Sequence, residues 1–407
     1  LGIRCRFSMV YGGTTYRKCG GTLVRIEPTA GQYGGPWLSY CTVRDWMDEV
    51  YRTNTKRIAI QVGKRSDELF SAVVANVARQ PILQTIGVGA DIYPYAMDKA
   101  RDEGVSSWEE LNRICMSEAG FSYVRGDTAS GGDLVFETRT ERAAKNTNQT
   151  TFDNTMYRLE IARDRDSIVG RVQVIVHPRQ IDTPNVVLYT LRDADVSDST
   201  AIPLGAGETK SIVAPYTDPS DRTNRIGGTS VVTPVATTDY TMNSSPGGGP
   251  SDVTADLAIV ITKGATAAFL DLTNNGSATG YVTFLQIRGL GIYDDIETSY
   301  EQTDAASVTA YGDNQIVYDA VYQALPTFGD GAARYFLQLN SSQLTTVDSI
   351  AIHGNRSDAL MTAALVREPG TRIGLAETVS GITTSTGFFV QSVDLTLTAK
   401  KQLDVVF

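Results

Sequence analysis

The sequence predicts a mainly β protein with an α+β segment: two β-barrel domains, an α+β domain and an inserted β-sandwich. Short apolar runs bounded by Gly, Pro, Asn and Asp fill most of the chain, and helix-period patterns occur in only a few places. The 407 residues, 42% of them hydrophobic, suffice for two or three cores at roughly 150 residues per domain. The expected domains are a first barrel at 1–65, an α+β domain with a connector at 66–166, the sandwich at 167–293 and a second barrel at 294–407.

The first region begins with a half-buried strand. Residues 3–10 alternate, with Ile3 and Phe7 on one face and Arg4 on the other, and Tyr11–Thr14 is typical of a hairpin turn. Further strands are expected at Gly21–Glu27, Trp37–Val43 and Ile58–Val62, and a short helix at Asp45–Val50.

Two helices are predicted in the α+β domain. The first begins at Ser66, presents Leu69, Val73 and Val77 as one apolar stripe and stops at Pro81. The second begins with a Ser107–Glu110 capping box and ends at Gly120. Strands are expected at Phe121–Val124 and Leu134–Glu137, followed by a surface connector at 141–166.

The sandwich is predicted from seven short strand patterns that no helix-period segment interrupts. These are Arg171–Val176, Val186–Leu191, Lys210–Ala214, Ser230–Val235, Leu257–Thr262, Ala267–Leu272 and Tyr281–Arg288. The longest loop between them is expected at Ser244–Asp252.

The last region returns to a mixed pattern. Helical spacing predicts a helix over Gln315–Gln323, ended by Pro326. Strands are expected at Tyr335–Leu339, Ser349–Ile352 and Phe388–Val393, and Asp394–Thr398 with Leu403–Phe407 is expected to close the second barrel as a hairpin.

Charge and hydropathy exclude several function classes. With 36 Lys and Arg against 46 Asp and Glu, the formal charge is −10, which disfavours a dedicated nucleic-acid or anionic-membrane binder. No apolar run approaches the ~20 residues of a transmembrane helix, so an integral membrane protein is not expected.

Cysteine and histidine offer little chemistry. The four cysteines form no C-x-x-C pair and are interpreted as free thiols, although a Cys19–Cys41 bridge is left open. The two histidines, His177 and His353, are interpreted as a strand-end residue and a turn residue. We therefore assign no catalytic residue, no metal ligand and no cofactor.

Two motifs resemble ligand loops and fail on inspection. Gly205–Ser211 lacks the glycines of a phosphate-binding loop and is interpreted as a hairpin turn. Asp193–Asp198 resembles half a calcium loop without its glycine and final glutamate, and is interpreted as a solvated loop.

Three pairs of segments carry a resemblance to a known family. Glu110–Tyr123 with Asp133–Arg139 resembles a helix ending in Ser-Glu-x-Gly and a strand hairpin found in minor tail proteins of long-tailed bacteriophages. The second pair, Tyr281–Gly289 with Asp304–Gly312, resembles the segment of this family that returns from the sandwich to the second barrel. The third pair, Pro369–Leu375 with Gly387–Val390, resembles the closing barrel of tail-hub proteins.

The resemblance implies a structural virion protein of the tail tip or baseplate hub. It implies a homotrimer in which hub-type barrels at 1–62 and 316–407 form a ring that joins the tail tube to the distal tip. Implied partners are the distal tail or tube protein, the tape measure and tip or fibre proteins; DNA would pass only transiently through an acidic lumen during ejection. The resemblance also implies that the protein is made in the host cytoplasm and is located in the phage tail. Contact with the host surface is left open. The alternatives are a tip-associated glycan-degrading enzyme and a host-surface adhesin.

Overall fold

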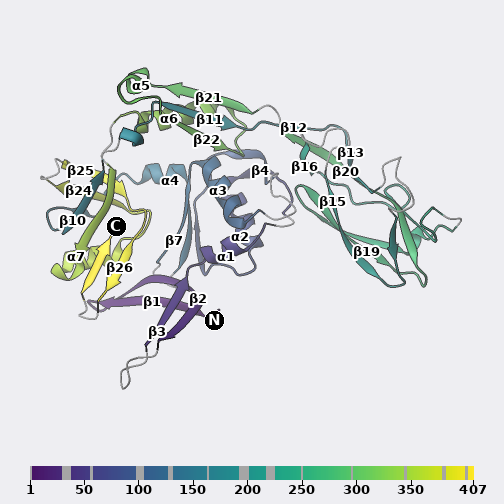
Figure 1. Cartoon of the computed structure of the whole chain (residues 1–407), viewed down its shortest axis with the longest axis horizontal. Helices are drawn as coiled ribbons and strands as arrows, with labels where there is room; N and C mark the ends of the chain where they lie inside the picture. The colour runs from purple at the N-terminus through teal and green to yellow at the C-terminus, as the bar shows by residue number, and fades with distance from the viewer. Residues whose placement is uncertain are drawn as a thin grey trace.

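The protein is described here from a computed structural model. The structure describes residues 2–29, 38–55, 58–97, 105–126, 132–162, 165–191, 201–216, 225–248, 251–294, 297–342, 346–377, 382–398 and 402–407. Within these ranges the chain is mainly β, as predicted, and is organised as several small sheets with short helices (Figure 1). None of these sheets closes into a barrel, so both barrel predictions are wrong for the described residues.

The N-terminal sheet, defined as β1 to β3, is open. Its antiparallel strands are β1 (Arg4–Tyr11), β2 (Thr14–Thr29) and β3 (Leu38–Arg44). The predicted hairpin turn is confirmed: Tyr11 pairs with Thr14, and the two glycines between them have positive φ. The sheet does not close because β4 (Gln61–Arg65), the next strand, pairs with β6 (Ile92–Ala96) instead.

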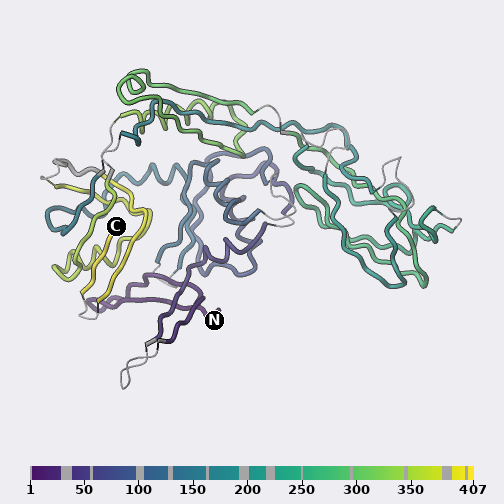
Figure 2. Tube along the Cα trace, viewed as in Figure 1, coloured from purple at the N-terminus to yellow at the C-terminus, as the bar shows by residue number. Residues whose placement is uncertain are grey.

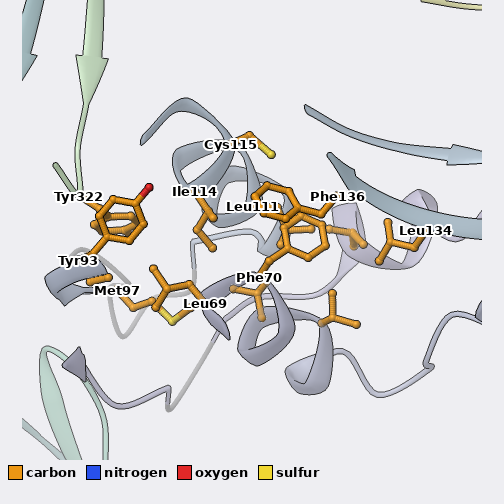
Figure 3. Close-up of a cluster of buried hydrophobic side chains, with 14 residues drawn as sticks. Leu69, Phe70, Tyr93, Met97, Leu111, Ile114, Cys115, Leu134, Phe136 and Tyr322 are labelled. Carbon is orange, nitrogen blue, oxygen red and sulfur yellow. The ribbon is translucent and has the colours of Figure 1, made fainter. Parts of the chain in front are cut away.

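The α+β unit follows and contains the core shown in Figure 3. Its helices are α1 (Met47–Arg52), α2 (Ser66–Asn76), α3 (Ser107–Glu118) and α4 (Arg139–Ala144), and its sheet, besides the β4–β6 pair, joins β5 (Leu83–Ile86), β8 (Asp133–Glu137) and β7 (Phe121–Arg125). Phe70 of α2 stacks on Phe136 of β8 with ring centroids 4.6 Å apart. The apolar stripe predicted for the first helix therefore packs on α3 and this sheet.

The ends of α3 differ from the prediction by one residue. The side chain of Ser106, rather than Ser107, caps the helix by accepting a hydrogen bond from the Glu109 amide at 3.2 Å. At the other end Ala119, rather than Gly120, adopts the left-handed conformation, with φ of 54°. The predicted connector at 141–166 begins inside α4 and also contains β9 (Thr151–Phe152) and β10 (Arg158–Ala162).

A separate sheet, the β11 sheet, was not foreseen. Its central strand β11 (Arg171–Val176) pairs antiparallel with β21 (Thr298–Thr303) and parallel with β22 (Gln315–Ala320). The segment at 315–323, predicted as a helix, is thus largely a strand, consistent with its β-branched and aromatic residues. Strand 171–176 was expected in the sandwich and lies outside it.

One helix covers the β11 sheet. It is α6 (Pro326–Asn340), which contains the segment 335–339 that was predicted as a strand. Pro326 stands in its first turn, where the missing amide costs nothing, and therefore starts this helix rather than ending one. A shorter helix, α5 (Ala305–Tyr311), precedes β22, and Asp304 caps it.

The sandwich consists of two sheets around one core and projects to one side of the molecule (Figure 2). In one sheet β20 (Gly280–Asp294) pairs with β12 (Arg179–Ile181), β13 (Val186–Thr190), β14 (Ile202–Leu204), β16 (Arg225–Thr229) and β17 (Tyr240–Asn243). The other sheet joins β15 (Thr209–Pro215), β19 (Ala267–Asn274) and β18 (Leu257–Lys263). The prediction of a strand at 230–235 is wrong, because these residues, which lie between β16 and β17, form no strand.

The C-terminal unit closes the chain. Its sheets are β10, β23 (Thr346–His353), β27 (Leu403–Val406) and β26 (Asp394–Leu397) in one, and β25 (Ile382–Phe389), β24 (Arg372–Glu377) and β9 in the other. They pack with α7 (Asp358–Val366), a helix that the sequence analysis missed. The predicted final hairpin is confirmed, with Leu397 opposite Leu403.

The topology predicts that the sandwich is dispensable for the rest of the fold. Val176 and Thr298 are paired neighbours in β11 and β21, so a short linker can bridge the two chain crossings. Replacing residues 179–296 by Gly-Ser-Gly-Ser is expected to leave a protein that unfolds cooperatively, measured by urea titration. It should lose about 1.5–3 kcal/mol, because Ile60, now packed on Ala265 and Ile292, becomes exposed.

The excised segment 179–296, expressed alone, is expected to fold on its own core. Loss of cooperative unfolding in the shortened chain would contradict the inserted arrangement.

Candidate functional site

Of the two loop motifs rejected in the sequence, one lies within the described residues. Gly205–Ser211 covers the turn between β14 and β15 and the first residues of β15, and in this turn the carboxylate of Glu208 accepts a hydrogen bond from the Gly205 amide at 2.6 Å. An acidic side chain therefore occupies the position that a phosphate would need. Asp193–Asp198 lies outside the described residues.

Histidine and cysteine take structural positions. His177 is buried at the end of β11, with Nε2 2.5 Å from Oδ1 of Asp319. The His353 ring stacks on Tyr157 with centroids 4.0 Å apart. All four cysteines are free; the Cys19–Cys41 bridge that was left open does not form.

Cys19 pairs with Phe7 and Cys41 with Ile26, at different points along β2. Within the described ranges, no group of three His, Cys, Asp or Glu is placed to hold a metal ion.

Buried polar contacts instead join residues that are far apart in the sequence, at two junctions between parts of the fold. At the first junction, Lys18 of β2 is 7% exposed and forms an ion pair with Glu368, 350 residues away. Its Nζ also donates to the Leu365 carbonyl at 3.0 Å. Burial raises the pKa of the Glu368 carboxyl, and Lys18 opposes that rise. The N-terminal sheet is thereby fixed to the end of α7.

Apolar contacts support the same junction. Met9, Tyr11 and Tyr16 of the N-terminal sheet pack against the core of the C-terminal unit. The Tyr11 hydroxyl donates to Oδ1 of Asp358 at 2.5 Å. Head and tail of the chain therefore form one continuous body (Figure 1).

At the second junction, a buried carboxylate gathers polar groups from several elements. Glu118, at the end of α3, accepts hydrogen bonds from Ser66 Oγ at 2.9 Å, Tyr93 OH at 3.2 Å and the Ala90 amide at 3.2 Å. Arg139 lies 3.7 Å from its Oε1. Burial is the main cause that raises the pKa of the Glu118 carboxyl.

The returning chain after β22 docks on the same helix. The Tyr322 amide donates to Ser117 Oγ at 3.0 Å, and the Tyr322 hydroxyl donates to the buried Glu110 carboxylate. Gln323 donates to the Ser117 carbonyl at 3.0 Å and to Asp91 at 2.8 Å. Tyr322 is also part of the apolar cluster in Figure 3. This contact fixes the β11 sheet on the α+β unit.

The sequence analysis missed these junction residues. Glu110 was expected to cap α3, yet its side chain is buried beneath Tyr322. Lys18 and Glu368 carry no local signal, because a charge in a strand or after a helix is usually solvated. An acid at a buried position of an otherwise apolar helix face, as at Glu110 and Glu118, was the one readable clue.

One surface is left uncovered. Both outer strands of the N-terminal sheet, β1 and β3, pair with no further strand of the described chain. The sheet also exposes large apolar side chains, which are Ile3, Phe7, Val10, Ile26, Tyr40 and Val43. Unpaired edges with exposed apolar residues are typical of a surface that another chain covers.

The buried carboxyl of Glu118 predicts a pH dependence. Its folded-state pKa is raised above the ordinary value of 4.5, so the folded protein binds this proton more tightly and loses stability as pH rises above 4.5. In Glu118→Gln this loss disappears. The free energy of unfolding of the variant, relative to the native protein, is therefore expected to increase between pH 4 and pH 7 in urea titrations.

Glu27→Gln, which changes an exposed acid of β2, is the matched control. A difference for Glu118→Gln that stays constant with pH, or that changes no more than the difference for Glu27→Gln, would contradict the assignment.

No described helix is both long and apolar enough to cross a membrane. No protein-family model matches the chain, and no curated protein matches its sequence. Among solved structures, the chain is similar to the tail protein from Neisseria meningitidis MC58, with a TM-score of 0.50 and 10% identity over 96% of this chain and 79% of that one. A second similar structure is the prophage MuSo2 43 kDa tail protein from Shewanella oneidensis, with a TM-score of 0.47 and 8% identity over 99% of this chain and 87% of that one. At this identity, the first likeness establishes a shared fold.

Proposed function

We propose that this chain is a structural protein of a bacteriophage tail, and that three copies form a ring at the tail tip. The fold shared with a Neisseria tail protein supports the first part. The observation that carries the second part is the N-terminal sheet. Within the described chain its edge strands pair with no further strand, it exposes apolar side chains, and it packs on the C-terminal unit.

The ring requires that each copy contacts the next through the same pair of surfaces. A sheet edge fixed on a rigid body can pair with, or pack against, the same body in a neighbouring copy. Repeating one such heterologous contact closes a ring when the rotation between copies permits it. The resemblance found in the sequence gives three as the number of copies, and the ring would join the tail tube to the distal tip.

A passage for DNA agrees with the charge of the chain. Since the formal charge is −10, we expect acidic side chains to outnumber basic ones on the wall of this passage, where they would repel phosphate at short range. The sandwich, which projects from the body, would face outward and contact a neighbouring tail protein.

Light-scattering mass measurement tests the ring. We expect a mass three times that of the 44.0 kDa chain. Val10, which is 72% exposed on β1, should lie in the contact, so Val10→Lys is expected to weaken association about 10- to 100-fold.

Val260→Lys is the matched control, because Val260 is 64% exposed on β18, an edge strand of the sandwich. It is expected to leave the mass unchanged. A native protein that runs as a single chain at all concentrations would contradict the ring and favour a monomeric adhesin.

A further inference from the structure

A cleft between α4 and the turn before β24 is lined by four cations. It lies where the α+β unit meets the C-terminal unit, with a volume of about 430 Å³, in the range of ligand pockets. The cations are Arg125, Lys145, Arg367 and Arg372, and the described residues of its wall include no carboxylate side chain. In a chain of net charge −10, this concentration of positive charge is a local exception.

Two of the four cations are already neutralised. Arg125 donates from Nε and Nη2 to Oδ2 of Asp133, at 3.0 and 2.9 Å. Lys145 lies 2.7 Å from Oε1 of the buried Glu137 and donates to the Gly370 carbonyl at 3.0 Å. These pairs hold the walls of the cleft in place.

The other two lack an acidic partner in the described chain. Arg372 donates from Nη1 to the Lys145 carbonyl at 2.9 Å, and its Nε has no acceptor. The side chain of Arg367, at the end of α7, makes no hydrogen bond or ion pair with the described residues, and its Nε is buried without an acceptor. Burial lowers the pKa of the Arg367 guanidinium, since no carboxylate offsets it.

The acid beside Arg367 in sequence does not compensate it. The Glu368 carboxylate pairs with Lys18 and accepts the Gly126 amide at 3.3 Å. Both arginines therefore keep donors for an external anion. Guanidinium groups recognise carboxylates through paired, charge-assisted hydrogen bonds, and they stay charged even when partly buried.

We propose that this cleft binds an acidic segment of a protein partner, whose carboxylates pair with Arg367 and Arg372. A DNA duplex fits the observations less well. Duplex binding depends on neutralising many phosphates, whereas two cations among the described residues of this cleft lack an acidic partner and the chain as a whole is acidic. The inference stands independently of the three-copy ring.

The test uses the full-length protein and a fluorescent peptide of six glutamates, followed by anisotropy at low salt. Arg367→Gln with Arg372→Gln is expected to weaken binding about 10- to 100-fold, as loss of two charge-assisted contacts implies. Arg25→Gln with Arg158→Gln removes the same charge from exposed positions outside the cleft and should change binding less than twofold.

Arg367→Lys keeps the charge but not the paired geometry, so its binding should be intermediate. Thermal unfolding of each variant checks that it folds, and Arg367→Gln alone serves if the double variant does not. A six-glutamine peptide should not bind.

Three results would overturn the proposal. They are no binding of the glutamate peptide by the native protein at millimolar concentration, equal weakening by the control pair, and tighter binding of a DNA duplex that depends on the same two arginines.

Discussion

The buried ion pair between Lys18 and Glu368 is the constraint on which the arrangement of this chain depends. The N-terminal sheet is open and contributes few buried side chains of its own, so it cannot be stable without a second surface. The C-terminal unit supplies that surface, and the ion pair determines the orientation. A buried charge that loses its partner costs about 3–5 kcal/mol, which disfavours any other way of docking the two ends.

The same logic applies around α3. Apolar packing alone would hold this helix against α2 and the sheet of the α+β unit, but it would tolerate sliding. Glu110, Ser117 and Glu118 add buried polar groups whose partners come from the segment after β22 and from β6. Because an unmet buried hydrogen bond is costly, Glu110 and Ser117 hold the segment after β22 in place, and Glu118 holds β6. Buried hydrogen bonds thus join the β11 sheet to the α+β unit, as the Lys18 ion pair joins the N-terminal sheet to the C-terminal unit.

Local signals in the sequence predicted turns, hairpins and helix starts correctly. The pairing of strands that are far apart in the sequence could not be predicted from them. The first hairpin, the closing hairpin and the helix at Ser66 were predictable, since turn glycines, alternation and capping act within a few residues. The barrels failed because whether β4 pairs with β3 or β6 is decided far along the chain. Residues 315–323 were misread because Ile316, Val317, Ala320 and Val321 recur at helical spacing, and the partner that selects a strand is β11, some 140 residues earlier. Lys18 and Glu368 gave no local signal for the same reason, and neither did the cationic cleft, whose walls come from three separate segments.

If the protein acts as a structural part of an assembly, its function should be visible in that assembly. The N-terminal sheet is the surface that we expect to form the contact between copies. Imaging of the purified protein by electron cryomicroscopy tests this most directly. The account predicts three copies around an axis with an open passage, in which β1 or β3 of each copy contacts its neighbour. Isolated chains, or a symmetric assembly in which the N-terminal sheet faces solvent, would contradict it.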